Sequence, residues 1–171
     1  SALITALSTG EPEVAAYPFT TKRLHLGHFI HRRRKYQMVD TPGLLDRPND
    51  ERNQIEMQAI AALENVGDIV LFLIDPSESG GTPLQEQMSL LREVEDLISA
   101  RKIILVHSKS DLDSEESIPG AVMVSSTKSI GLEELREKVV HEIAADAIVD
   151  PLQLPEGWHR EDTEIKEQSL D

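Results

Sequence analysis

The sequence predicts an α/β domain with a mostly parallel sheet and helices on both of its faces. Segment 69–74 is a short, continuous apolar run, and segment 102–106 is apolar after its first residue, Lys102; both are typical of strands buried on both sides. Longer segments with apolar residues at helical spacing alternate with these runs. Parallel strands need long crossover connections, so the alternation indicates a parallel sheet with right-handed helical connections.

The expected elements follow one another from the amino terminus. In chain order they are a short helix at 1–7, a polar loop at 9–21, strands at 23–30 and 35–39, a helix at 51–66, a strand at 69–74, a helix at 83–100, strands at 102–106 and 121–124, and a helix at 132–147. The basic cluster from Arg32 to Lys35 is expected at a hairpin turn. It is interpreted either as a solvated hairpin tip or as a local contact to RNA.

Composition limits the class of protein. The chain has 171 residues, of which 39% are hydrophobic, and this predicts one domain at 1–147 followed by an acidic, extended tail at 148–171. Its formal charge of −14 argues against a broad nucleic-acid-binding face. It has no cysteine, which excludes disulfides and thiolate metal sites and fits a reducing cytoplasm. No run of residues in the sequence is long and apolar enough to predict a membrane span.

A candidate phosphate site follows the strand that ends at Val39. Asp40-Thr41-Pro42-Gly43 places a carboxylate at the carboxyl end of the strand and a glycine three residues later. A carboxylate there can reach Mg²⁺ through water, and the Gly43 amide can approach a terminal phosphate oxygen. Pro-Gly after a strand is also an ordinary turn, so the tetrapeptide is interpreted together with the loops downstream.

Two later loops carry the chemistry of a guanine site. His107-Ser108-Lys109-Ser110-Asp111 follows a buried strand, and Asp111 can accept two hydrogen bonds from the N1 and N2 donors of guanine, while the Lys109 stem can lie across the ring. Ser125-Ser126-Thr127-Lys128 follows the last strand, where backbone amides can meet the guanine carbonyl oxygen. Serine-rich loops are common as turns, but parallel strands place all these loops at one edge of the sheet.

These motifs resemble the third, fourth and fifth signature segments of translation-factor-type GTPases. A narrower resemblance, over residues 1–135, is to the nucleolar GTP-binding protein (Nog) family of Obg-related GTPases. It rests on the following segments: Tyr17 to Lys22, Gly27-His28, Asp46 through Ile60, and Asp75-Pro76-Ser77-Glu78 with Gly81. The resemblance implies a Ras-like P-loop GTPase fold and a role in assembly of the large ribosomal subunit.

The resemblance also assigns roles by position. Ser1 matches the phosphate-loop serine that coordinates Mg²⁺, and Thr21 matches the switch threonine that closes over the same ion. The implied metal ligands are Ser1, Thr21 and Asp40, and the implied catalytic residues are Thr21 and Gly43. The implied nucleotide-binding residues are Ser1, Ser108, Lys109, Asp111, Ser126, Thr127 and Lys128. Loss of the third phosphate of GTP would release the switch loops.

Three departures from the family pattern change these expectations. The Gly-rich phosphate loop and its strand are missing. We therefore expect the sequence to be a segment of a longer protein, whose upstream part contains this loop, its strand and the family's helical domain. Without that part, the chain should bind nucleotide far more weakly than an intact GTPase does. Ser108 replaces the usual Asn, which predicts looser binding with guanine preference retained through Asp111. Leu44 stands where some relatives of Ras carry a water-orienting Gln, so hydrolysis should be slow without a partner or a monovalent ion.

The sequence therefore supports two hypotheses of different classes. The first is a GTP-binding switch that slowly hydrolyses GTP to GDP with Mg²⁺ and acts with rRNA and ribosomal proteins of the large subunit or its precursor, in the cytoplasm or, in a eukaryote, the nucleolus. The second is a non-catalytic, GTPase-like interaction scaffold, favoured by the missing phosphate loop and by Ser108. No membrane partner is expected, and the oligomeric state stays open.

Overall fold

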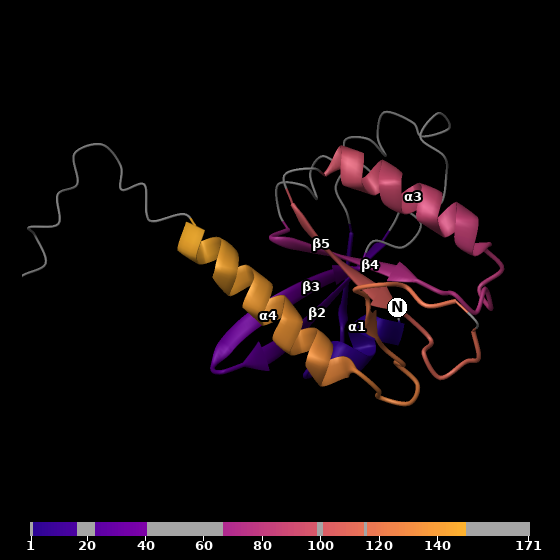
Figure 1. Cartoon of the computed structure of the whole chain (residues 1–171). Coiled ribbons are helices and arrows are strands. Elements are labelled where there is room, and N and C mark those ends of the chain that lie inside the picture. Colours follow the sequence, from indigo (N-terminus) through magenta and orange to yellow (C-terminus); the bar gives the residue numbers. More distant parts are fainter. Residues whose placement is uncertain (1, 17–22, 41–66, 99–100, 115, 150–171) are drawn as a thin grey trace, which may run out of the picture.

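Within the residues that the structure describes, the fold combines a parallel sheet, an antiparallel sheet and three helices. Figure 1 shows their arrangement. A computed structural model of the chain describes residues 2–16, 23–40, 67–98, 101–114 and 116–149. The predicted helix at 51–66 and most of the tail at 148–171 lie outside these residues. No helix within the described ranges is long and apolar enough to cross a membrane.

The parallel sheet contains the strands that carry the candidate base-binding loops. Its strands are β4 (Ile69–Ile74), β5 (Lys102–His107) and β6 (Val122–Met123), in that spatial order. Ile74 pairs with His107, and His107 pairs with Met123. Because the three strands are parallel and end at the same level, the loops that follow them begin side by side. The predicted parallel arrangement is confirmed for these strands.

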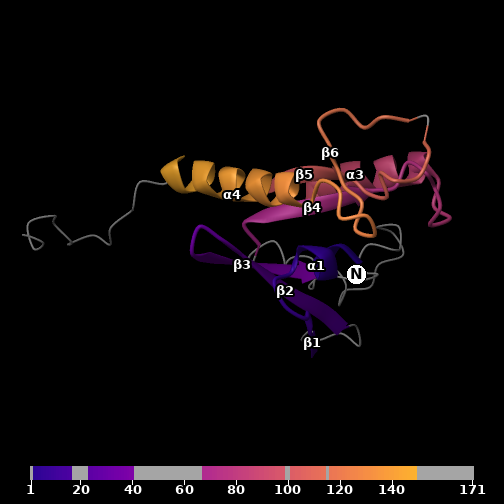
Figure 2. The same ribbon diagram turned by 90° about the horizontal axis from the view of Figure 1, so that it is seen from below.

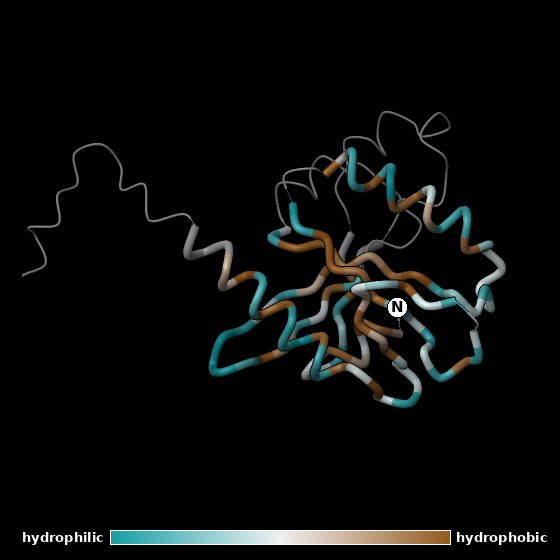
Figure 3. Tube along the Cα trace, viewed as in Figure 1, coloured by the Kyte–Doolittle hydropathy of each residue, from teal (hydrophilic) through white to brown (hydrophobic). Residues whose placement is uncertain are grey.

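Helices cover both faces of this sheet, as predicted. Alternate residues of β4 and β5 point to opposite faces and separate two hydrophobic clusters. One face packs against α3 (Leu84–Leu97), and its cluster is built from buried side chains that include Phe72, Ile74, Leu91, Val94 and Ile98. Figure 3 shows the hydrophobic strands passing through the middle of the fold, with hydrophilic positions on the outer side of α3.

The opposite face packs against α4 (Leu132–Val149) and α1 (Ala2–Leu7). Buried residues there include Leu3, Leu7, Ile104, Val106 and Leu135. The expected helix at 1–7 therefore forms within the described residues. A helix of six residues is not stable by itself in water, so the packing of its three buried side chains stabilises it. α4 runs two residues beyond the predicted boundary at 147.

The antiparallel sheet lies on the other side of α1 from the parallel sheet (Figure 2). Its strands are β1 (Glu13–Ala16), β2 (Arg23–His31) and β3 (Arg34–Asp40). The predicted hairpin is confirmed, with Arg32 and Arg33 at its tip in the left-handed region at φ 46° and 68°. The polar loop predicted at 9–21 is wrong at 13–16, because backbone pairing with β2 recruits this edge segment into the sheet.

Candidate functional site

The loop after β5 presents Asp111 at the carboxyl edge of the parallel sheet. The N–H of Ser110 donates to Val124 O at 3.1 Å, and the N–H of Leu112 donates to Lys109 O at 2.9 Å. The first bond ties the loop to the end of β6, and the second closes a turn around Asp111. Asp111 is exposed at this position, where a ligand can reach its carboxylate.

The loop after β6 folds around the buried hydroxyl of Ser125. Reciprocal backbone bonds of 3.1 and 3.0 Å join Ser125 to Ile130 and close the loop. Ser125 Oγ accepts a hydrogen bond of 3.1 Å from the N–H of Lys128 and lies 3.1 Å from Thr127 Oγ1. The Lys128 amide is thus already used inside the loop, which leaves the amides of Ser126 and Thr127 as the candidates for a base carbonyl.

The two loops meet at Asp111. Thr127 Oγ1 donates to Asp111 Oδ2 at 3.4 Å. Hydrogen bonding from Ser125 is the main influence that holds the pKa of Asp111 below its ordinary value. Partial desolvation raises this pKa, while the hydrogen bond from Thr127 and the positive charge of Lys128 lower it further. A carboxylate kept ionised at the rim of a site is a pure hydrogen-bond acceptor, which is the group that guanine N1 and N2 require.

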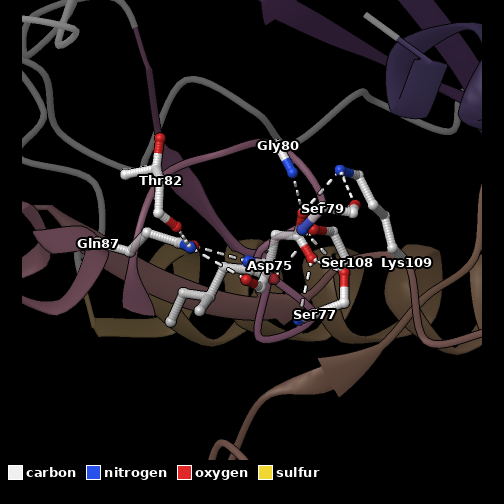
Figure 4. Close-up of polar contacts among 9 residues, drawn as sticks. Asp75, Ser77, Ser79, Gly80, Thr82, Gln87, Ser108 and Lys109 are labelled. Atoms are coloured by element: carbon white, nitrogen blue, oxygen red, sulfur yellow. Dashed lines mark hydrogen bonds and ion pairs between the residues drawn. The ribbon is translucent and has the colours of Figure 1, made fainter. Parts of the chain in front are cut away.

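Lys109 points to a different acidic residue. Its Nζ lies 2.6 Å from Asp75 Oδ2 and 2.7 Å from Ser79 Oγ, in the loop that follows β4 (Figure 4). Ser108 Oγ donates to Ile74 O at 2.9 Å, beside the bond of 2.8 Å from the Ser108 N–H to the same oxygen. The hydroxyl of Ser108 is therefore directed into the sheet, toward β4.

The predicted metal ligands are only partly described. Asp40 ends β3, where its Oδ2 lies 3.7 Å from His25 Nδ1 and its side chain is 24% exposed. Asp40 Oδ2 is itself buried, and the role of Asp40 in holding an ion through water stays a prediction. Ser1, Thr21 and Gly43 lie outside the described residues. The described part of the chain contains no group of three His, Asp or Glu side chains that could hold a metal by itself.

Sequence reasoning missed two parts of this site. Asp75 was identified only through a family resemblance, although the strand register could have placed it: Ile74 pairs with His107, so Asp75 must lie level with Ser108 and next to Lys109. Ser125 was grouped with its loop, but its role beneath Asp111 was not predicted. The pattern of apolar and polar residues along the sequence predicts helices and strands, and it does not reveal a buried hydroxyl at the centre of a loop.

Comparison with known proteins places the chain in a family. The family model for nucleolar GTP-binding protein 1 matches residues 54–111. An uncharacterised protein of Methanocaldococcus jannaschii is 46% identical over 118 residues, covering 69% of this chain and 32% of that protein. Nucleolar GTP-binding protein 1 of Encephalitozoon cuniculi is 43% identical, covering 66% of this chain and 21% of that protein. The chain spans at most about a third of the length of these two relatives.

Solved structures agree with the fold. The crystal structure of nucleolar GTP-binding protein 1 from Plasmodium falciparum has a TM-score of 0.74 at 27% identity, covering 86% of this chain and 81% of that one. The cytosolic domain of the Thermotoga maritima FeoB iron transporter in its GMPPNP form has a TM-score of 0.63 at 27% identity, covering 82% of this chain and 57% of that one.

The parallel sheet, its covering helices and these structural neighbours define a P-loop GTPase-like α/β fold. The predicted fold class is confirmed. Nucleolar GTP-binding protein 1 of Caenorhabditis elegans is 32% identical over 95% of this chain and 26% of that protein. Within the GTPase-like class, the chain therefore belongs to the nucleolar GTP-binding protein family, as the resemblance of its motifs predicted.

Proposed function

We propose that this chain binds GTP and GDP through the loops at the carboxyl ends of β5 and β6. The observation that carries the proposal is the carboxylate of Asp111, which is exposed, accepts a hydrogen bond from Thr127 and has a lowered pKa. Ionised Asp111 accepts from guanine N1 and N2, donors that adenine lacks. The FeoB neighbours were solved in GDP and GMPPNP forms, which supports a guanine nucleotide as the ligand of this fold.

Slow hydrolysis of GTP to GDP is the proposed reaction. Ser1, Thr21 and Asp40 would hold Mg²⁺, which neutralises charge on the phosphates when it is bound. The Gly43 amide would bind the terminal phosphate oxygen and, with Thr21, sense its loss. Leu44 cannot orient an attacking water, so the reaction depends on a partner or a monovalent ion for speed.

Fluorescent GDP and ADP titrations test the base specificity. We expect the chain to bind GDP more tightly than ADP, and a version extended at its amino terminus to bind GDP more tightly still. Asp111→Ala should weaken GDP binding at least about tenfold, because the base loses two hydrogen bonds to a charged acceptor. Asp113→Ala removes the same charge from an exposed position two residues away and serves as the matched control. Absence of GDP binding by both versions of the chain would contradict the proposal.

Assembly of the large ribosomal subunit is the proposed setting, in the cytoplasm or in the nucleolus of a eukaryote. The name of the relatives supports the nucleolus as the location, and the β2–β3 hairpin supports a contact with RNA, because its tip exposes Arg32, Arg33 and Arg34 on an otherwise acidic chain. Exposed Arg clusters bind RNA phosphates. Replacing these three residues by Gln should reduce cosedimentation with large-subunit precursors and leave GDP affinity unchanged. Equal cosedimentation by both proteins would show that the hairpin is not the contact.

A second candidate function is that of an interaction scaffold that no longer uses nucleotide. The observation that favours it is Ser108, whose Oγ is engaged by Ile74 O at 2.9 Å and is not directed toward a ligand. Ser108→Asn separates the two functions, because an amide side chain restores the reach that the hydroxyl lacks. Tighter GDP binding by Ser108→Asn supports a working nucleotide site, whereas no GDP binding by the parent or the variant supports the scaffold.

A further inference from the structure

The carboxylate of Asp75 is the centre of a polar cluster at the end of β4 (Figure 4). Oδ1 accepts from the N–H of Ser77 at 3.1 Å and from Ser77 Oγ at 2.5 Å. Oδ2 accepts from Ser79 Oγ at 3.2 Å, from the N–H of Gly80 at 3.3 Å and from Lys109 Nζ at 2.6 Å. Four of these donors come from the loop of Asp75 itself, and only Lys109 comes from another loop.

The backbone of Asp75 is also fixed, by Gln87 of α3. The N–H of Asp75 donates to Gln87 Oε1 at 2.7 Å, and Gln87 Nε2 donates to Asp75 O at 3.0 Å and to Thr82 O at 2.8 Å. The carboxylate is therefore held at both its backbone and its side chain before any ligand binds. Such a group can position a partner without paying conformational entropy at the moment of binding.

Lys109 is the residue that this arrangement holds. Its ammonium group sits between Asp75 Oδ2 and Ser79 Oγ, although the side chain is 44% exposed, and its backbone adopts φ 54°. The Asp75 side chain is only 15% exposed. Burial alone would raise the pKa of Asp75, but hydrogen bonds from Lys109, Ser77 and Ser79 outweigh it and lower the pKa, so the pair is charged at neutral pH.

Asp111 and Lys109 belong to the same tight turn, closed by the bond from the N–H of Leu112 to Lys109 O. A lysine whose ammonium is fixed can offer only its aliphatic stem to a neighbouring ring. A free lysine would have to lose several rotamers before it could cover the same ring. The charge on Asp75 thus controls the part of Lys109 that a base next to Asp111 would contact.

We propose that Asp75 is a positioning residue for the nucleobase: it holds the ammonium of Lys109 so that the lysine stem is preorganised beside the base that Asp111 accepts. The ligand class is a purine nucleotide with donors on its Watson–Crick edge. This inference rests on the proposed function. It adds a second loop, after β4, to the residues that determine base affinity.

The test is a double-mutant cycle between Asp75→Asn and Lys109→Met in the full chain, with fluorescent GDP and inosine diphosphate as ligands. Each single variant should weaken GDP binding about three- to tenfold. The double variant should bind GDP no more weakly than the single variant with the lower GDP affinity. The ratio of GDP to inosine diphosphate affinity should stay unchanged in Asp75→Asn, because inosine lacks only the amino group that Asp111 reads. Asp75→Glu should recover part of the lost affinity by keeping the charge.

Asp68→Asn is the matched control, since it removes an exposed carboxylate that precedes β4 at the opposite end of the strand. If Asp75→Asn fails to fold, Ser79→Ala replaces it, because that change removes one acceptor of Lys109 Nζ and spares the carboxylate. Multiplicative effects in the cycle, or parent-like affinity in Asp75→Asn, overturn the inference and leave the proposed function intact. Absence of binding of both nucleotides, by the parent chain and by the version extended at its amino terminus, overturns both.

Discussion

The hydroxyl of Thr127 lies 3.4 Å from Asp111 Oδ2, so the loops that follow β5 and β6 meet at one carboxylate. The contact joins residues 16 positions apart in the chain. Ser125 lies beneath it, fully buried, and its hydroxyl contacts Thr127 and Lys128 within the loop that follows β6. The site is therefore supported from inside the fold and not only by residues at its surface. Removing the support should change the chemistry of the exposed carboxylate.

Ser125→Ala is expected to raise the pKa of Asp111 toward that of an ordinary aspartate, about 3.9. Hydrogen bonding from Ser125 is the main influence that lowers this pKa. The variant also leaves the Lys128 N–H without its acceptor, which should reduce the free energy of unfolding by about 1–2 kcal/mol. A carboxyl-carbon NMR titration measures the pKa, with Ser117→Ala at an exposed position as the control. An unmoved Asp111 pKa would contradict the assigned role of Ser125.

The sequence predicts those parts of the fold in which one strong pattern dominates. The apolar run at 69–74 became β4 with the predicted bounds, since a strand covered on both faces leaves little ambiguity. β1 was missed because Glu13-Val14-Ala15-Ala16 has weak strand propensity and is held by its pairing with β2. Asp111 and Thr127 were predicted to share a site, and they touch. The pairing of Lys109 with Asp75 was not predicted, because a contact between loops depends on strand register.

Asp75→Asn should make the stability of the chain less sensitive to acid. The pKa of Asp75 is lowered in the folded state, so the carboxylate contributes stability above the unfolded-state pKa of about 4, and that contribution is lost as the pH falls through the lower folded-state pKa. At pH 7 the variant should lose about 1–3 kcal/mol relative to the parent. The difference should shrink as the pH drops below about 4.

Urea unfolding of the parent and of Asp75→Asn at several pH values between neutral and acidic measures this effect. Asp68→Asn, which removes an exposed carboxylate, is measured at the same pH values as the control. A stability difference between parent and Asp75→Asn that stays constant down to the lowest pH would show that the charge of Asp75 contributes nothing.

Gly131 fixes the turn between the Ser125 loop and α4. Its φ is +68°, and a Cβ there would overlap Met123 O of β6. Gly120 has a similar φ of +78°, but a Cβ there would meet nothing within 4 Å. Both Gly→Ala variants should be strained by their backbone conformation, and Gly131→Ala should lose roughly 1–3 kcal/mol more because the main chain of β6 has to move.

Thermal unfolding of the two glycine variants separates strain from overlap. The measured difference between them isolates the close approach to Met123, since the backbone conformation is shared. Equal losses in both variants would mean that the turn relaxes without disturbing β6.

Arg136 connects the two ends of the described chain. Its Nη2 donates to Leu7 O at 2.9 Å and to Ala6 O at 3.4 Å, while Nη1 donates to Glu133 Oε2 at 2.9 Å. The carbonyls at the carboxyl end of a helix have no partner inside the helix, so this guanidinium satisfies groups of α1 that would otherwise be left in a half-buried position. Arg136→Met keeps the aliphatic stem and removes the donors, and it should cost about 1–3 kcal/mol.

Hydrogen exchange localises the effect of Arg136→Met. Amides of α1 should exchange faster, whereas those of α3, on the opposite face of the sheet, should be much less affected. Lys138→Met provides the matched control on the same helix, because Lys138 Nζ donates to an exposed loop carbonyl, Gly120 O, at 3.3 Å and not to α1. Uniform acceleration across both helices would indicate global destabilisation and would rule out a local tether. Selective loss of protection in α1 would show that six residues remain helical because α4, 129 positions later in the chain, holds their last carbonyls.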